Sequence, residues 1–474
     1  MRILYSIASL SKILLNVAIY RLITGGEYKA VGLSWDKSVC DLFNELRRRH
    51  GKPLIRRPSR DPSLIELLLH RNGFAPMNEY LIAPDGTFIM SEDEFLEVAP
   101  RLTEDYFTGS RQNMDEYSNA DHIIAGLLLQ ELTGRKLSQV MQEAVFNPLG
   151  MSYTVMDEAS LQKLEAEGAI VAAGHRVSGD RRRIDRLPER KYLDDTVEVA
   201  SLGVWSCTED LAKLIGEFLR ALDHLNTKFE KEDTLRFFGL SSNHGDGIRT
   251  SLGGMICPLD SIFAGNESTN RILSPTDQFP PYTLGRHPDG DPCEVYYKAG
   301  AVDGFASALY ISLDERTFVI VLANSSGPLD VTDHIARYVL QEAFNLSPRV
   351  DVVTKAIEEG TRSSTRLQDL ERADEDTLNW SENVDDFAGT YQHVRYGQKL
   401  EITPAGDVIL RGKSKSSSPM KARVSGNTMR IFPGPEGFGI ERWTVWDNRD
   451  FTLENRRGKA VLMGNAPHDR YEKL

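Results

Sequence analysis

The sequence predicts an α+β protein in which a domain of helices and antiparallel sheet is followed by a small all-β barrel. The chain has 474 residues, which is more than one ordinary hydrophobic core accommodates. Helical patterns fill its first half, strand patterns gather at 295–323, and short alternating runs alone follow residue 384. We therefore expect a large domain at 1–347, a charged linker at 348–383 and a barrel at 384–474.

The first 23 residues are strongly apolar, but Lys12 and Arg21 interrupt them. No small-residue cleavage site follows, and no uncharged stretch is long enough to span a bilayer. We expect a helix buried on all sides rather than a leader or an anchor. A membrane anchor at 1–23 stays open as an alternative, which recovery of the protein without detergent would exclude.

Four more helices are expected from apolar residues at helical spacing, each bounded by a turn or a cap. They lie at about 61–72, 120–132 and 136–146, and the fourth opens at Glu209 with Thr208 as its N-cap.

Strand patterns first appear in the second half of the chain. The runs at 295–298, 306–313 and 318–323 are apolar and β-branched, and turn residues at Gly304 and Asp314 separate them. Such spacing predicts adjacent antiparallel strands.

The charged, helical pattern at 355–383 suits a connector between domains. Beyond it, alternating runs punctuated by Gly, Pro, Asn and Asp predict a small barrel or sandwich. These runs are 399–403, 408–412, 428–432 and 441–446.

Charge and cysteine content exclude several functions. A net charge of -13 argues against nucleic acid as a main partner, because phosphate binding needs clustered Lys and Arg. The four cysteines are scattered, without the spacing of a zinc site, so we expect free thiols and a reducing, cytoplasmic location. The sequence also lacks the HExxH and GxSxG motifs, which excludes the simplest metalloprotease and α/β-hydrolase interpretations.

Ser9 and Lys12 are candidates for a nucleophile and its base. On a helix, residues three apart share a face, so the hydroxyl and the amine come within hydrogen-bonding reach. The spacing alone is weak evidence, but Ser9 opens a long apolar helix, whose N-terminal dipole favours developing negative charge. The same spacing recurs at Ser34/Lys37, Ser160/Lys163 and Ser418/Lys421.

Two other short motifs are compatible with this chemistry. Tyr117-Ser118-Asn119 directly precedes the helix expected at 120–132, and Lys298-Ala299-Gly300 ends a strand pattern. Each has a plain structural explanation when taken alone, as an Asn-capped turn and as a lysine on an edge strand.

Taken together and in this order, the three motifs resemble the SxxK, YxN and KTG set of class C β-lactamases, penicillin-binding proteins and related serine esterases and transacylases. Flanking landmarks such as Phe146 to Met151 and Ala323-Asn324-Ser325 extend the resemblance over about residues 3–326. It implies a β-lactamase/transpeptidase-like fold, an antiparallel sheet flanked by helices. The C-terminal barrel resembles the lipocalin-like appendage of some members.

The resemblance also implies catalytic roles. Ser9 would form an acyl-enzyme and Lys12 would take its proton, which requires the lysine pKa to fall by roughly 3 units from about 10.4. Tyr117 would pass a proton to the leaving group, Asn119 would orient Lys12 or the acyl chain, and Lys298 would supply a second ammonium.

The backbone N–H groups of Ser9 and Ala301 would form the oxyanion hole. Ala299, Gly300 and Trp205 would contact the substrate. Ala299 replaces a hydroxyl with which β-lactamases hold a substrate carboxylate, so we expect a small-molecule ester or thioester without that carboxylate, in hydrolysis or in acyl transfer such as secondary metabolism uses. No metal or organic cofactor is needed for this chemistry.

The sequence departs from the family at its start, because only eight residues precede Ser9. Relatives have sheet strands there, so we expect N-terminal strands to be missing and the exposed edge to be covered by another segment or by a partner chain, as in a homo-oligomer. A non-catalytic binding protein with a truncated N-terminus is the alternative. The intact Ser9, Lys12, Tyr117 and Lys298 count against it.

Overall fold

The computed structural model describes residues 2–58, 60–72, 81–83, 87–106, 117–187, 193, 196–223, 231–245, 248–270, 282–432, 450–456, 458–464 and 470–474. The chain divides into two compact units. Unit 1 comprises 1–54, 61–72 and 121–367, and unit 2 comprises 55–60, 73–120 and 368–474.

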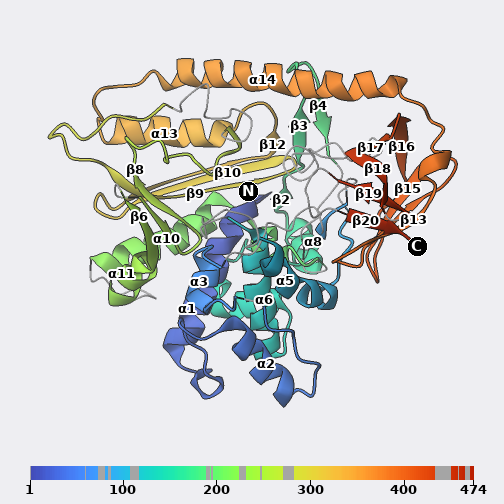
Figure 1. Ribbon diagram of the computed structural model, residues 1–474. Coiled ribbons are helices and arrows are strands. Elements are labelled where there is room, and N and C mark those ends of the chain that lie inside the picture. The colour runs from blue at the N-terminus through green and yellow to red at the C-terminus, as the bar shows by residue number, and fades with distance from the viewer. Residues whose placement is uncertain are drawn as a thin grey trace. The chain divides into compact units, whose positions relative to one another are not determined.

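The centre of unit 1 is a six-stranded antiparallel sheet with the order β11-β10-β9-β8-β7-β6 (Figure 1). The three strands of this sheet that come last in the chain, β9 to β11, are those that the sequence predicts. All eight residues of β10 are buried, because the sheet is covered on both faces. The strands are β6 (Ser241–Gly245), β7 (Ile248–Ser251), β8 (Gly254–Pro258), β9 (Glu294–Val302), β10 (Phe305–Ser312) and β11 (Thr317–Ala323).

Helix α13 (Val331–Ala343) packs on β10 and β11. Figure 1 shows it on one face of the sheet, while α1 (Ser11–Gly25) and α10 (Thr208–Leu222) lie toward the other. In α1 every residue from Ser11 to Tyr20 is buried, as its apolar composition predicts. The helix ends at Gly26, whose φ of 72° is a left-handed conformation that suits glycine.

The prediction of one continuous helix at the N-terminus is wrong for its first residues. The chain begins with strand β1 (Ile3–Ser6), which pairs with β2 (Ile170–Val171) and with β5 (Trp205–Ser206). Burial alternates along β1, so partners on both sides stabilise it as a strand although its residues are apolar enough for a helix. A separate three-stranded sheet contains β3 (His175–Val177), β4 (Ile184–Arg186) and β12 (Ser325–Ser326).

The other predicted helices form, with shifted ends. The helix expected at 61–72 is shorter, because a capping box of Ser63 and Glu66 starts it and His70 leaves helical geometry with φ +57°. Thr208 is the first residue of α10 rather than its cap, which is Cys207. The remaining helices of unit 1 are α2 (Val39–Arg49), α3 (Leu64–Leu68), α6 (Asn119–Thr133, which begins in unit 2), α7 (Leu137–Met141), α8 (Glu158–Ala166), α9 (Val199–Leu202) and α11 (Lys231–Gly239).

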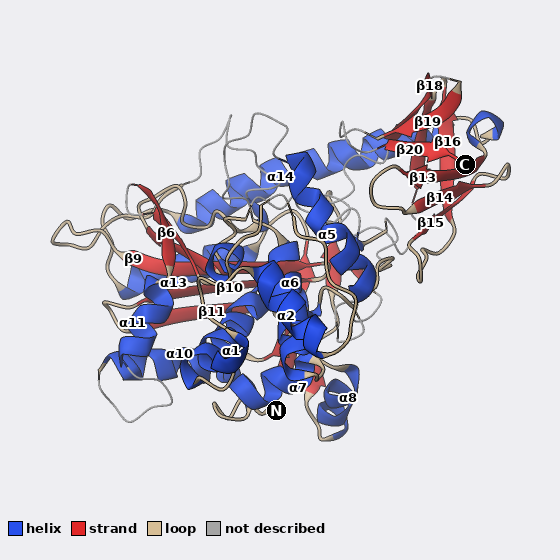
Figure 2. Cartoon of the chain, turned by 60° about the horizontal axis from the view of Figure 1, so that its bottom comes forward, coloured by secondary structure: helices blue, strands red, loops and turns tan. Residues whose placement is uncertain are grey.

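Unit 2 contains the predicted barrel, a closed ring of eight antiparallel strands around a core that includes Tyr391, Ile431 and Phe451 (Figure 2). Ile89 joins this core. The run expected at 441–446 lies outside the described residues. The strands are β13 (Gly389–His393), β14 (Lys399–Ile402), β15 (Asp407–Arg411), β16 (Met420–Ser425), β17 (Thr428–Phe432), β18 (Asp450–Arg456), β19 (Lys459–Met463) and β20 (Arg470–Lys473).

Two helices complete the description. Helix α5 (Glu92–Tyr106) belongs to unit 2, where Glu94 accepts a hydrogen bond of 3.1 Å from the Ser414 N–H. Helix α14 (Val352–Asp376) covers much of the predicted charged connector and carries the chain from unit 1 into unit 2. Within the described ranges, no helix combines the length and the apolar composition that crossing a membrane requires.

The four cysteines are buried and free, as the sequence predicts. Burial raises the pKa of Cys257 and that of Cys293 to about 12. Their thiols are therefore held in the unreactive protonated form.

Candidate active site

Ser9 lies where β1 turns into α1. The strand ends at Ser6, a 3-10 turn covers Ala8–Leu10, and the Ile7 N–H fixes the turn by donating to the Val204 carbonyl at 3.1 Å. Ala8 has φ +49°, a left-handed conformation that is unfavourable by on the order of 1 to 2 kcal/mol for any residue with a β-carbon. This strain sits immediately before the predicted nucleophile, as is common at functional sites.

Strand β9 approaches the backbone of Ser9 so closely that only glycine fits at position 300. A β-carbon on Gly300 would lie 2.6 Å from the Ile7 oxygen and 2.9 Å from the Ser9 nitrogen. Ser307 on β10 secures the contact, because its hydroxyl donates to the Ile7 carbonyl at 3.0 Å. The motif residues 298–300 are thereby brought beside the turn that carries the serine.

Lys12 follows Ser9 by one turn and is fully buried. Its Nζ donates to Ser9 Oγ at 3.1 Å and to the Ser201 carbonyl oxygen at 3.1 Å. The structure thus brings together the amine and the hydroxyl that the spacing predicts. Sequence reasoning missed Ser201, because a backbone carbonyl as partner leaves no residue-type signal.

Other lysines at the same spacing lack this environment. Lys163 is 75% exposed and lies 3.9 Å from Glu167, and Lys421 is 63% exposed and pairs with Asp407. Ser34 is exposed on the surface. Burial therefore distinguishes the pair of Ser9 and Lys12.

Lys298 is the second buried lysine of unit 1. Its Nζ lies 2.9 Å from Glu267 Oε2, and the same oxygen accepts the Ala299 N–H at 3.4 Å. Lys298 is 1% exposed, whereas Glu267 is partly open to solvent. No sequence pattern indicates Glu267, since it precedes Lys298 by 31 positions and belongs to no motif.

Two histidines and a carboxylate lie buried close enough to affect this charge cluster. Burial, with the nearby Lys298 and Lys12 as smaller causes, lowers the pKa of His70 well below its usual value. His122 is held neutral in the same way, with its ring 5.2 Å from that of His70. Burial raises the pKa of Asp121, which is 2.6 Å from His70 Nδ1.

Glu198 supports the other side of the lysine. It accepts a hydrogen bond from the Ser201 hydroxyl, while the Ser201 carbonyl faces Lys12. Burial raises the pKa of the Glu198 carboxyl. Burial therefore favours the uncharged, protonated form of the Glu198 carboxyl. A negative charge beside Lys12 would stabilise its ammonium form, and burial limits that charge.

The remaining predicted residues are placed as follows. Tyr117 is 42% exposed, with its hydroxyl 3.5 Å from Asn119 Oδ1, and both belong to unit 2, so their place beside Ser9 stays a prediction. Trp205 is 4% exposed and packs edge-on against Phe305 at 5.3 Å between ring centres. Its ring contributes to the core, and a substrate contact for it also stays a prediction.

A sequence profile of the Beta-lactamase family matches residues 3–344. A "Putative D-alanyl-D-alanine carboxypeptidase" of Escherichia coli O157:H7 is 26% identical over 159 residues, which is 32% of this chain and 34% of the relative. An "N-acetylmuramyl-L-alanine amidase" of Bacillus subtilis (strain 168) is 26% identical over 161 residues, 32% of this chain and 33% of that protein. The matches thus span about a third of each relative.

Among solved structures, the octameric penicillin-binding protein homologue from Pyrococcus abyssi is similar to the whole chain. The TM-score is 0.53 at 17% identity, with 100% of this chain and 89% of that chain covered. This likeness shows a common fold.

Proposed function

Because the chain belongs to the Beta-lactamase family over residues 3–344, we propose that it is a serine hydrolase or acyltransferase that works through an acyl-enzyme on Ser9. The observation that carries the proposal is the 3.1 Å contact between Lys12 Nζ and Ser9 Oγ, two buried side chains of unit 1. A hydroxyl beside a buried amine is the arrangement that nucleophilic acyl transfer needs.

In the first half-reaction Lys12 takes the proton of Ser9 while the Ser9 oxygen attacks the acyl carbon. The oxyanion is stabilised by the N–H groups of Ser9 and Ala301, and the closeness of Gly300 to the Ser9 nitrogen supports this pairing. Lys12 passes this proton to Tyr117, which is oriented with Asn119 and donates a proton to the leaving alcohol or thiol as its bond to the acyl carbon breaks. Water or another nucleophile then attacks the acyl-enzyme and gives up its own proton to Tyr117. That proton returns through Lys12 to the Ser9 oxygen as the bond between Ser9 and the acyl group breaks.

The proposed donor is an ester or thioester without a carboxylate next to the acyl group. Ala299 supports this choice, because a methyl group offers no hydrogen bond to such a carboxylate. The D-alanyl peptides named for the Escherichia coli relative are the competing substrate class. Acyl transfer to an alcohol, as in the making of secondary metabolites, is the competing second half-reaction.

The test compares substrates and variants in one assay. Wild type should hydrolyse p-nitrophenyl butyrate and show little turnover of a chromogenic cephalosporin or a D-Ala-D-Ala peptide. Ser9→Ala should lose about 10³-fold or more in kcat, whereas Ser34→Ala, which has the same motif spacing, should keep the wild-type rate. Efficient cephalosporin or peptide turnover would overturn the substrate class, and equal ester rates in wild type and Ser9→Ala would overturn the nucleophile.

A further inference from the structure

A carboxylate of the protein itself holds the donors of the 298–300 motif. Glu267 Oε2 is 2.9 Å from Lys298 Nζ and 3.4 Å from the Ala299 nitrogen. Ala299 has no hydroxyl as a third donor. The motif therefore already contacts a carboxylate of the protein, that of Glu267, whose side chain is 20% exposed. This carboxylate takes the place of an acidic group that a substrate would otherwise present to the motif.

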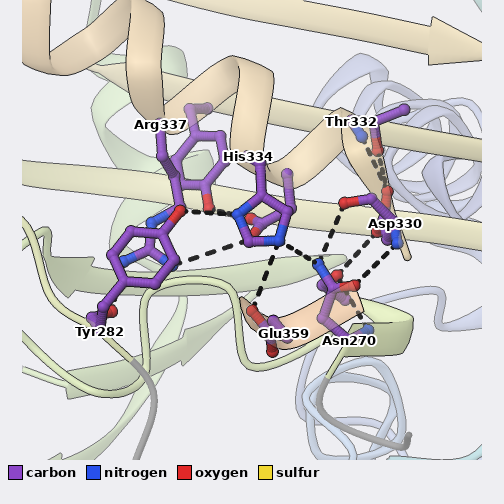
Figure 3. A network of polar contacts seen from close by, with 10 residues as sticks. Asn270, Tyr282, Asp330, Thr332, His334, Arg337 and Glu359 are labelled. Carbon is purple, nitrogen blue, oxygen red and sulfur yellow. Dashed lines mark hydrogen bonds and ion pairs between the residues drawn. The ribbon is translucent and has the colours of Figure 1, made fainter. Parts of the chain in front are cut away.

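The segment that carries Glu267 is fixed in place by the loop before α13. The Ser268 hydroxyl donates to Asp330 Oδ2 at 2.7 Å, and the Asn270 amide donates to the Asp330 carbonyl at 3.0 Å. In return the Asp330 N–H donates to Asn270 Oδ1 at 2.7 Å. Figure 3 shows Asn270 and Asp330 facing each other in this network.

Buried groups of α13 extend the same network. His334 lies 3.2 Å from Asn270 Nδ2 through its Nε2 and 2.8 Å from the Tyr282 hydroxyl through its Nδ1. Arg337 stacks over the Tyr282 ring at 3.9 Å (Figure 3). Gly265 begins the segment with φ +85°, and a β-carbon there would come within 3.0 Å of the Asp333 carboxylate. Such a network leaves Glu267 little freedom to swing away.

We infer that Glu267 is a specificity-determining residue that serves as a built-in counter-ion for Lys298 and makes the site reject acyl substrates with a carboxylate near the acyl group. An incoming anion would find the lysine charge balanced and would be repelled by Glu267. The inference rests on the proposed acyl-enzyme function and deepens it, because it names Glu267, in addition to Ala299, as a cause of the preference for uncharged substrates.

The experiment uses two esters of matched length, p-nitrophenyl butyrate and the p-nitrophenyl monoester of succinic acid, and compares their kcat/KM values. Wild type should favour the uncharged ester. Glu267→Gln should shift the ratio toward the anionic ester by about 10-fold or more, and Glu267→Gln with Ala299→Thr should shift it further. Glu267→Asp, which keeps the charge, should retain most of the wild-type preference.

The control is Glu294→Gln, which removes a carboxylate from the start of β9 that pairs with Arg249. It should leave the ratio unchanged. A folded Glu267→Gln enzyme that hydrolyses the uncharged ester with an unchanged ratio would overturn the inference while the proposed function stands. Absence of any ester hydrolysis and of Ser9 labelling in wild type would instead overturn the proposed function, and the inference with it.

Discussion

Lys12 is the side chain positioned to activate Ser9. A serine hydroxyl becomes a useful nucleophile only when a neighbouring group removes its proton. Lys12 Nζ donates to the Ser9 hydroxyl at 3.1 Å and also to the Ser201 carbonyl oxygen, which helps to hold the amine in place. The neighbouring His70 and His122 are kept neutral by burial.

Lys12→Met should therefore slow acylation of Ser9 by about 10²- to 10⁴-fold, because the chain length is kept while the base is removed. The rate of ester hydrolysis and the rate of labelling by a serine-directed probe measure the effect. Lys163→Met changes an exposed lysine of a Ser-x-x-Lys motif and is the matched control. A Lys12→Met enzyme that stays folded and reacts at the wild-type rate would remove Lys12 from the mechanism.

The sequence identifies the residues of the site that belong to local motifs, and it misses their partners. Ser9 and Lys12 are three positions apart, so helical geometry alone predicts their contact. Glu267 and Ser201 meet the lysines through tertiary packing across 31 and 189 positions. No periodicity relates such residues, and only the assembled sheet and α9 bring them to the site.

At the scale of elements, the start of α13 is the structural support of the segment that carries Glu267. Asp330 caps the helix by accepting from the Thr332 N–H at 3.0 Å, and it also accepts from Ser268 at 2.7 Å. Asp330 is 3% exposed, and burial, followed by the charge of Asp333, raises its pKa to about 6. One carboxyl thus joins the helix, the loop and the segment 265–270.

The raised pKa predicts a pH dependence of stability. A folded pKa above the unfolded value of about 3.8 means that the native state binds the proton more tightly, so this contribution is complete below about pH 4 and is lost as the pH rises through about 6. Between pH 4 and 7 the unfolding free energy of wild type should fall relative to Asp330→Asn by on the order of 3 kcal/mol. Denaturant unfolding across that range measures the difference.

Asp157→Asn removes another capping carboxylate, that of α8, and serves as the control for loss of a cap. A constant offset between Asp330→Asn and wild type at all pH values would contradict the proposed titration.

Element prediction succeeds where burial determines the pattern. Strands β9 to β11 are predicted because their apolar runs are long, whereas β6 to β8 are not, since β6 has the polar sequence Ser241 to Gly245. Strand β8 forms by pairing with the edge of β9, where Met255 lies opposite Tyr297, and β7 and β6 then pair in turn onto β8 and β7. For β1 the apolar pattern predicts a helix instead. Its pairing partners β2 and β5 are more than 160 positions away, so no local pattern indicates a strand.

At the scale of the whole molecule, the chain has two compact units with separate hydrophobic cores. The barrel core contains Phe451, which is 2% exposed, and the sheet core of unit 1 contains Tyr297 and Tyr310. Proteins built this way often violate two-state unfolding. The sequence predicts the barrel from its alternating runs, and the closed barrel of β13 to β20 confirms it.

Calorimetry should accordingly resolve two unfolding transitions. Phe451→Ala should destabilise one of them by about 3 to 5 kcal/mol, through the cavity it leaves in the barrel core. The other transition and the acylation of Ser9 should be unchanged. A single transition that shifts as a whole in Phe451→Ala would show that the two cores unfold together.

The central claim is that Ser9 is an activated nucleophile, and intact-mass spectrometry after exposure to a fluorophosphonate probe tests it most directly. Wild type should gain the mass of one adduct, Ser9→Ala should gain none, and Ser34→Ala should behave as wild type. No adduct on folded wild type, or an adduct that persists in Ser9→Ala, would contradict the claim and favour a non-catalytic binding protein or another nucleophile.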